Sequence, residues 1–157
     1  MERVPMTKVG AAQLQKELEF LKGEKRHKII AAIEEARAHG DLSENAEYHA
    51  AKEEQGLNEA RIKDVEDKIA RAHIIDPATI NSEKIVFGAT VELIDLDKGT
   101  EVTYQIVGVD EADLEHGKIS ITSPIARALI GKTEGDTATV HAPGGVREYE
   151  IQSLSYA

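Results

Sequence analysis

The chain has 157 residues, of which 41% are hydrophobic and 31% charged, with few aromatic residues and no cysteine or tryptophan. This composition predicts a folded, soluble protein with an aliphatic core, and it excludes a disulfide scaffold, a thiolate metal site and a cysteine nucleophile. The net charge of −10 lies mostly in the second half: residues 1–75 carry 13 basic and 15 acidic side chains, whereas residues 76–157 carry 6 basic and 14 acidic ones. So acidic a protein is unsuited to binding a nucleic-acid backbone unaided, because phosphate binding needs a positive surface.

Nothing in the sequence indicates a membrane segment. The longest apolar run, residues 29–33, is far too short to cross a bilayer. The first ten residues have no apolar stretch of the signal-peptide type. We therefore expect a cytoplasmic protein with no membrane partner.

Two long amphipathic helices are predicted in the first half, over residues 11–38 and 44–74. Steps of three or four residues separate most of their apolar positions, which is the helical period; the exception is the step from Leu21 to Ile29. The expected apolar stripes are Leu14, Leu18, Leu21, Ile29, Ile33 and Ala36 on the first helix, and Ala46, Ala50, Leu57, Ile62, Val65, Ile69 and Ala72 on the second. Because only a few residues around Gly40 connect them, the helices must form an antiparallel coiled-coil hairpin.

The second half changes to the period of a β-strand. A linker over residues 76–84 follows the hairpin, and alternating segments then predict a small antiparallel sheet, with a tight hairpin at "APGG". One short helix is expected after Ser123, a good N-cap, with Pro124 at its first position. The predicted fold class is α+β, divided into residues 1–75, 76–84 and 85–157.

The turn "GDLSEN" between the helices carries the first candidate for chemistry. Asp41 and Glu44 have the spacing of a capping box, and Ser43 is a second possible cap. The same two carboxylates, kept ionised at the positive end of a helix, also suit a divalent cation. They would form an incomplete site, since nothing nearby supplies the remaining ligands, so a metal bound here would need ligands from another molecule.

Other side chains near the turn have two interpretations each. Arg37 and Lys52 could form solvated ion pairs with neighbouring glutamates or a small positive spot for a nucleic-acid strand. Tyr48 could pack across the hairpin or stack on a base. The histidines show no metal-ligand spacing, and no nucleophile elbow, P-loop or dinucleotide fingerprint is present.

Several segments, in order along nearly the whole chain, resemble the GreA/GreB family of bacterial transcript cleavage factors. They are "GDLSENAEYHAAKEEQ" at the turn, "VPMTKVGAAQLQKELEFL" at the start, and "VFGATVEL", "ISITSPIARALIGK" and "APGGVREYEI" in the second half. The resemblance implies an FKBP-like C-terminal domain that docks on RNA polymerase. It also implies a coiled coil that enters the polymerase secondary channel and stimulates Mg²⁺-dependent cleavage of backtracked nascent RNA, so that arrested complexes resume synthesis.

The resemblance also assigns roles to residues. Asp41 and Glu44 would hold Mg²⁺ and its attacking water within the polymerase active centre, supported by Ser43, Asn45 and Tyr48. Arg37 and Lys52 would lie near the extruded RNA 3′ end. Polymerase docking would fall on three consecutive residues, Thr122, Ser123 and Pro124. The protein would have no activity of its own, bind no small-molecule substrate, hold no metal stably alone and act as a monomer.

Two other functions stay open at this point. A non-cleaving polymerase inhibitor of the same fold would also carry an acidic turn. An FKBP-like isomerase or chaperone is suggested by the second half alone, and it needs a dense aromatic pocket, whereas residues 76–157 contain only Phe87, Tyr104, Tyr149 and Tyr156.

Overall fold

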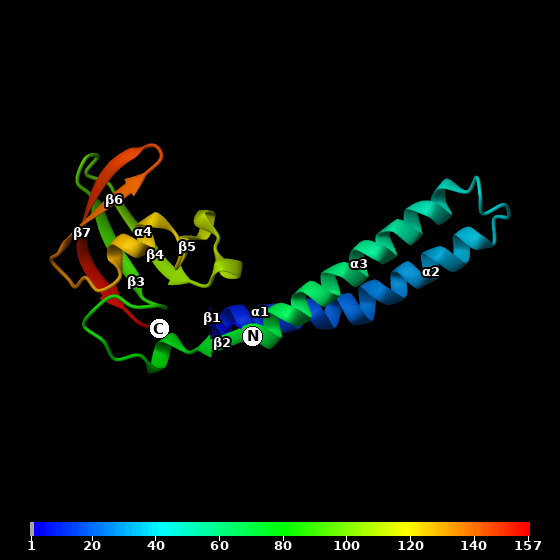
Figure 1. Cartoon of the computed structure of the whole chain (residues 1–157), viewed down its shortest axis with the longest axis horizontal. Helices are drawn as coiled ribbons and strands as arrows, with labels where there is room; N and C mark the ends of the chain where they lie inside the picture. Colours follow the sequence, from blue (N-terminus) through cyan, green and yellow to red (C-terminus); the bar gives the residue numbers. More distant parts are fainter. Residues whose placement is uncertain (1) are drawn as a thin grey trace. The chain divides into compact units, whose positions relative to one another are not determined.

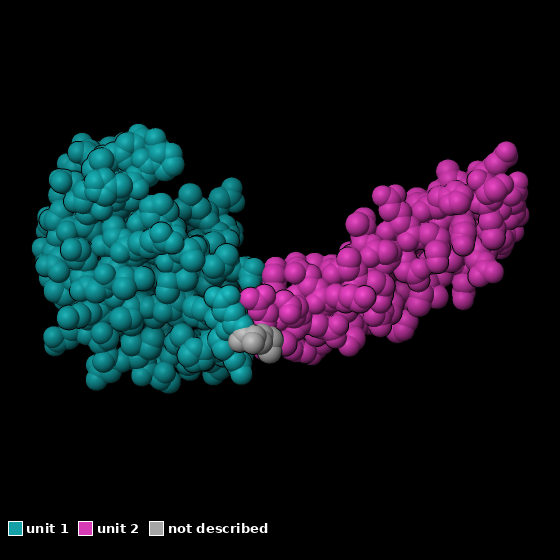
Figure 2. Space-filling view, viewed as in Figure 1, with its two compact units in different colours: residues 1–10, 72–157 teal, residues 11–71 magenta. Residues whose placement is uncertain are grey.

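The computed structural model describes residues 2–157, which divide into two compact units (Figure 2). The hairpin unit comprises residues 11–71, and the sheet unit comprises residues 2–10 together with 72–157. These boundaries differ from the predicted division into 1–75, 76–84 and 85–157, because both the start of the chain and the expected linker join the sheet unit. None of the helices in this described range is long and apolar enough to cross a membrane.

The hairpin unit consists of two helical arms (Figure 1). The first arm is α1 (Lys8–Phe20), a π turn (Leu21–Lys25) and α2 (Arg26–Arg37); the second is the single helix α3 (Ala46–Arg71). An apolar cluster joins the arms and contains Leu14, Leu18, Leu21, Ile62, Val65 and Ile69. This confirms the predicted hairpin, with its apolar cluster at the end away from the turn.

The predicted apolar stripe of α3 is wrong over two turns. Leu57 is 67% exposed, whereas its neighbour Asn58 is only 2% exposed, and Ala51 rather than Ala50 is buried. The buried residues of α3 are Ala51, Asn58, Ile62 and Val65, and the half-buried Ile69 packs against the apolar cluster. Their steps of seven, four, three and four residues follow a heptad pattern, in which Asn58 is the polar member.

Charged side chains connect the two arms along their flanks. Arg26 forms two hydrogen bonds with the carboxylate of Glu59, at 2.8 and 3.1 Å, and Arg61 forms a pair with Glu17 at 2.6 Å. The hydrogen bonds that the Arg61 guanidinium donates to the Glu17 carboxylate raise its pKa above its ordinary value. Exposed pairs of this kind contribute roughly 0–1 kcal/mol each, so the apolar seam provides most of the stability of the hairpin.

A short parallel pair of strands, not predicted from the sequence, precedes α1 and follows α3. β1 (Val4–Thr7) pairs with β2 (Ala72–Ile75), where the second helix was expected to continue to residue 74. The carboxylate of Glu111 accepts hydrogen bonds from the Thr7 and Gly108 backbone N–H groups, both at 2.9 Å, and from the Thr7 hydroxyl. These contacts explain why the start of the chain belongs to the sheet unit.

The main sheet has five strands in the order β5-β4-β3-β7-β6. The strands are β3 (Thr90–Asp95), β4 (Glu101–Val107), β5 (Lys118–Ser120), β6 (Thr137–Ala142) and β7 (Gly145–Ser155). Neighbours are antiparallel except β4 and β5, so the sheet is mixed rather than wholly antiparallel as predicted. The chain crosses over between β4 and β5 through two 3₁₀ turns, Val109–Glu111 and Leu114–His116.

Two other structural predictions for the second half, the tight hairpin and the short helix, are confirmed. β6 and β7 form the tight hairpin expected at "APGG", with Ala142 opposite Gly145. The short helix α4 (Pro124–Leu129) begins after Ser123, whose Oγ accepts the Ala126 N–H at 3.2 Å. The fold class is α+β.

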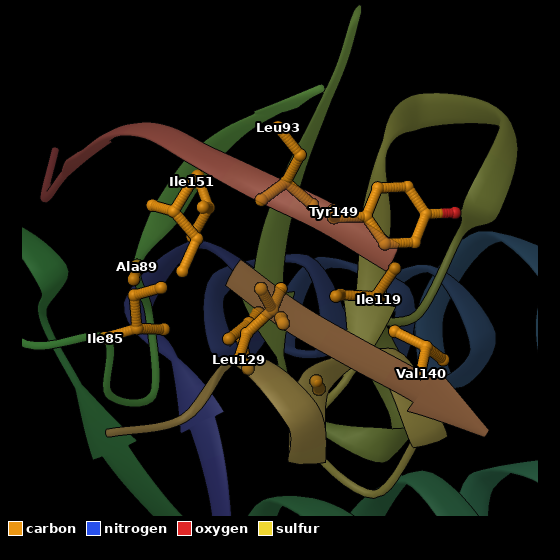
Figure 3. Packing of buried hydrophobic residues seen from close by; sticks show 12 residues of the cluster. Ile85, Ala89, Leu93, Ile119, Leu129, Val140, Tyr149 and Ile151 are labelled. Atoms are coloured by element: carbon orange, nitrogen blue, oxygen red, sulfur yellow. The ribbon is translucent and has the colours of Figure 1, made fainter. Parts of the chain in front are cut away.

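Aliphatic side chains from the sheet and α4 form the core of the sheet unit (Figure 3). The labelled members are Ile85, Ala89, Leu93, Ile119, Leu129, Val140, Tyr149 and Ile151, all buried. The end of the expected linker is fixed to this unit, because the Tyr156 hydroxyl donates to Lys84 O at 2.6 Å and Lys84 bridges to Thr133.

Candidate functional site at the hairpin tip

The chain reverses direction between α2 and α3 over residues 38–45, which we call the tip. The last turn of α2 closes with a hydrogen bond from the His39 N–H to Ala36 O at 3.1 Å. Gly40 follows with a φ of 110°, a conformation that residues with a Cβ rarely adopt. The glycine thus ends the first arm and starts the turn that carries Asp41.

Asn45 closes the tip from the other side. Its Oδ1 accepts the Tyr48 N–H at 2.9 Å, the bond that defines an N-cap, and its Nδ2 donates to Ala36 O at 2.6 Å. One side chain therefore caps α3 and ties it to the last turn of α2. The predicted capping box of Asp41 and Glu44 is wrong, because Asn45 takes the capping position.

Asp41 is instead held by Ser43. The Asp41 Oδ1 accepts both the Ser43 hydroxyl at 2.8 Å and the Ser43 N–H at 3.0 Å. The hydroxyl bond first, and then the backbone bond, lower the pKa of Asp41 below its ordinary value. A fully exposed carboxylate at the tip therefore stays ionised throughout the neutral range, with one oxygen occupied by Ser43.

Removing the Ser43 hydroxyl tests this arrangement. Because its pKa in the folded protein is lowered, Asp41 stays deprotonated to a lower pH than a free aspartate. It loses the charge that strengthens its bonds with Ser43 only as the pH falls through the pKa of the folded protein. We expect Ser43→Ala to raise the pKa of Asp41 part of the way to its ordinary value, because the backbone donor stays. NMR titration of the side-chain carboxyl carbons between about pH 2 and 7 measures this shift. Ser43→Thr keeps a hydroxyl and should titrate like the native chain, whereas identical titrations of native and Ser43→Ala proteins would contradict the assignment.

Glu44 lies beside Asp41 at an open hollow of the tip. The hollow is lined by His39, Asp41, Glu44, Asn45, Ala46 and Glu47. The carboxylate oxygens of Asp41 and Glu44 are ligands that Mg²⁺ prefers. Within residues 2–157 no group of three or more His, Asp or Glu side chains is arranged to hold a metal ion. Asp41 and Glu44 fit Mg²⁺ by chemistry, and a metal held by these two carboxylates would need further ligands.

The two cations near the tip are not neutralised by acids. The exposed Arg37 side chain makes no hydrogen bond or ion pair with any described residue, and the Lys52 Nζ donates to the amide oxygen of Gln55 at 3.1 Å. Ion pairs with neighbouring glutamates, one of the two interpretations of these residues, are therefore not found. Both positive charges are available to an anionic ligand.

Two rings lie just beyond the tip. The Tyr48 and His49 ring centroids are 5.5 Å apart, and the half-buried Tyr48 carries the N–H that Asn45 caps. His49 Nε2 is 3.3 Å from Ser43 O. This contact was not predicted from the sequence, although His49 stands six residues after Ser43 and one turn into the helix, within reach of the turn.

The proposed docking segment lies in the sheet unit. Thr122 and Pro124 are exposed, whereas Ser123 is half-buried and uses its hydroxyl twice, donating to Ser120 O at 2.7 Å and capping α4. Ser123 thus shapes the segment, while the Thr122 and Pro124 side chains are exposed to solvent.

Comparison with known proteins gives a consistent result over the whole chain. Residues 4–74 match the family model described as transcription elongation factor, N-terminal, and residues 80–156 match the one described as transcription elongation factor, GreA/GreB, C-term. The chain is 61% identical to transcription elongation factor GreA of Ralstonia nicotianae over 99% of both chains, and 59% identical to that of Alkalilimnicola ehrlichii over the full length of both. Among solved structures it is 30% identical to GreA factor homolog 1 (Gfh1) of Thermus thermophilus, covering 98% of this chain and 99% of that one, with a TM-score of 0.44.

The fold and the tip define a class of protein: a chain of two units, a β unit and a helical hairpin with an acidic turn between its two arms. The family models cover both units, and the relatives match nearly all of their own length. This chain belongs to the GreA/GreB family of transcription elongation factors.

Proposed function

We propose that this chain binds RNA polymerase and stimulates Mg²⁺-dependent endonucleolytic cleavage of backtracked nascent RNA, which rescues arrested complexes. The hairpin enters the secondary channel and brings the tip to the polymerase active centre. The hydrolytic activity belongs to the polymerase, and this chain supplies the side chains that complete the site. It acts in the cytoplasm as a monomer, which size-exclusion chromatography with light scattering can test.

The observation that carries this proposal is the state of Asp41. Its carboxylate is fully exposed, oriented by Ser43 and kept ionised by the two hydrogen bonds that lower its pKa. A carboxylate that served only to cap the helix would point back at the α3 amides, but Asn45 performs that function. Asp41 and Glu44 are thus free to bind a cation whose other ligands belong to a partner.

Each tip residue has a distinct role in this proposal. Mg²⁺, when bound, polarises an RNA phosphate and lowers the pKa of a coordinated water. Asp41 and Glu44 would both supply carboxylate ligands to it, and Glu44 would also orient the attacking water and accept its proton. Ser43 keeps Asp41 in place, and Asn45, with Tyr48, keeps the turn closed.

The two cations that no acid neutralises would bind the RNA. Arg37 and Lys52 flank the tip on opposite arms, where their charges attract the backbone of an extruded RNA 3′ end. In the sheet unit, Thr122, Ser123 and Pro124 would dock on the polymerase surface.

A stalled, backtracked elongation complex with 3′-labelled and 5′-labelled RNA tests the function. Adding the native protein with Mg²⁺ should shorten the 5′-labelled RNA and release a short 3′ fragment much faster than the polymerase does alone. Inhibition of both synthesis and cleavage would instead support the non-cleaving inhibitor. Catalysis of prolyl isomerisation in a peptide, without any effect on RNA, would support the isomerase.

Arg37 allows a test of the RNA contact. We expect Arg37→Ala to lower the cleavage rate about 3- to 10-fold at subsaturating factor, because a lost phosphate contact weakens RNA positioning in a salt-dependent way. The measurement is the cleavage rate at a series of potassium chloride concentrations. The rate should fall less steeply with salt for the variant than for the native protein. Lys28→Ala, in the same arm but paired with Glu24 at 3.2 Å, serves as the control, and an equal loss in both variants would argue against a specific role for Arg37.

A further inference from the structure

The π turn of the first arm has a geometric cause. In an α-helix each residue turns by about 100°, so Ile29, eight residues after Leu21, would point about 80° away from it, and Ala36 about 60° away. One extra residue taken up by a π turn brings both to within about 40° of Leu21. Leu21, Ile29 and Ala36 are indeed all buried, and the π turn begins at Leu21 and ends before Ile29.

A buried polar residue lies against this π turn. Asn58 Nδ2 donates to Leu21 O, the first carbonyl of the turn, at 3.1 Å across 37 residues of sequence. Among the described residues, Asn58 Oδ1 is the one buried side-chain oxygen or nitrogen without a hydrogen-bond partner. A buried acceptor without a donor destabilises the folded state, so stability alone does not account for Asn58 at a seam position where an aliphatic residue would fit the heptad pattern.

Asn58 and Asn45 bind the first arm in the same way. Each is on the second-arm side of the hairpin and donates its side-chain amide to a carbonyl of the first arm, Leu21 O and Ala36 O. The two bonds are 15 residues apart on the first arm and 13 apart on the second, which correspond to about 22 and 20 Å in α-helices. The first arm therefore has surplus chain between the bonds, and the π turn takes up part of it.

We propose that Asn58 is a positioning residue: its hydrogen bond to Leu21 O holds the π turn, which keeps α2 and the tip in phase with α3. If the turn rewound as a regular α-helix, α2 would rotate and Ala36 O would no longer face Asn45. The tip would lose the bond that closes it, and Asp41 and Glu44 would lose their common placement. The consequence for RNA cleavage rests on the function proposed above, whereas the effect on the hairpin does not.

The test replaces Asn58 by Leu in the full chain. The variant removes the unpaired oxygen, so we expect the Tm to rise by about 3 °C, while amide hydrogen exchange of residues 22–26 becomes at least about 10-fold faster and RNA cleavage at saturating factor falls at least about 5-fold. Gln55→Leu is the matched control: it makes the same amide-to-leucine change one turn away, where the side-chain oxygen accepts a hydrogen bond from Lys52 of the same helix. It should leave the exchange of residues 22–26 and the cleavage rate unchanged.

Deletion of Gly23 provides a rescue. Without Gly23 the step from Leu21 to Ile29 becomes seven residues, so a continuous α-helix keeps both in the seam. The double variant, Gly23 deleted and Asn58→Leu, should recover most of the native cleavage rate, whereas a residue needed merely for packing would not be rescued by shortening the opposite arm.

Several results would overturn the proposal. For Asn58→Leu these are unchanged hydrogen exchange of residues 22–26, an unchanged cleavage rate together with a raised Tm, or a lowered Tm. For the double variant it is a cleavage rate that the deletion of Gly23 does not restore. Hydrogen exchange needs no polymerase, so it still decides the role of Asn58 in the hairpin if the native protein proves not to stimulate cleavage, in which case the proposed function alone fails.

Discussion

Asp41→Asn is expected to lower the rate of stimulated RNA cleavage about 100-fold, with polymerase binding unchanged. Asn has nearly the same shape as Asp and can still accept the Ser43 hydrogen bonds, so the tip should keep its fold. It loses the negative charge, and loss of a charged oxygen near a catalytic metal typically costs one to three orders of magnitude in rate. Single-turnover cleavage of 5′-labelled RNA in a backtracked complex measures the effect, and competition with labelled native protein measures binding.

Glu47→Gln is the matched control for this experiment. Glu47 lines the same hollow as Asp41 and Glu44 but lies in the first turn of α3, and its change removes the same charge. We expect its cleavage rate to stay within about 3-fold of native, while Glu44→Gln should resemble Asp41→Asn. If Asp41→Asn cleaves at the native rate, Asp41 is not the metal ligand; if Glu47→Gln is as damaging, the tip acts through its total charge.

Asn45→Ala is expected to lower cleavage about 10-fold. The change removes both the cap of α3 and the bond to Ala36 O, and loss of a cap alone destabilises a helix by about 1 kcal/mol. Because the tip is distant in sequence from the apolar cluster of the hairpin, the protein should remain folded. Cleavage in a backtracked complex and hydrogen exchange of residues 45–49 are the measurements.

Asn45→Asp separates the two functions of this side chain. Asp is an equally good N-cap, but its carboxylate cannot donate to Ala36 O. If the bond between the arms positions the tip, Asn45→Asp should keep the protection of the Tyr48 amide and still lose cleavage several-fold. Native cleavage in Asn45→Asp would show that capping alone matters.

The amount that could be predicted from the sequence depends on how local each interaction is. The hairpin, the N-cap of α4 and the tight hairpin at "APGG" all depend on residues within about one turn of one another, and all three are confirmed. β1 and β2 were missed because each is only four residues long and its partner lies far away in the sequence. β5 was assigned to an antiparallel sheet because strand periodicity carries no information on direction.

The tip shows the same division at the level of single residues. Asp41 and Glu44 were picked out from their spacing and residue types, but the spacing suggested a cap that the structure assigns to Asn45. Asn, Asp and Ser are nearly equivalent N-caps, so which one is used depends on where α3 starts, and that start is set by the Asn45 bond to Ala36 O in the other arm.

The sequence by itself determined that this chain has a helical hairpin with an acidic turn and a separate β unit, because helical and strand periods, turn residues and charges are local properties. Only the tertiary structure decided that Ser43 orients Asp41, that Asn45 closes the tip and that Asn58 lies against a π turn. The bonds of Asn45 and Asn58 depend on how each arm is rotated about its own axis relative to the other. One residue more or less in an arm changes that rotation by about 100°. That phase is fixed by packing along the whole seam.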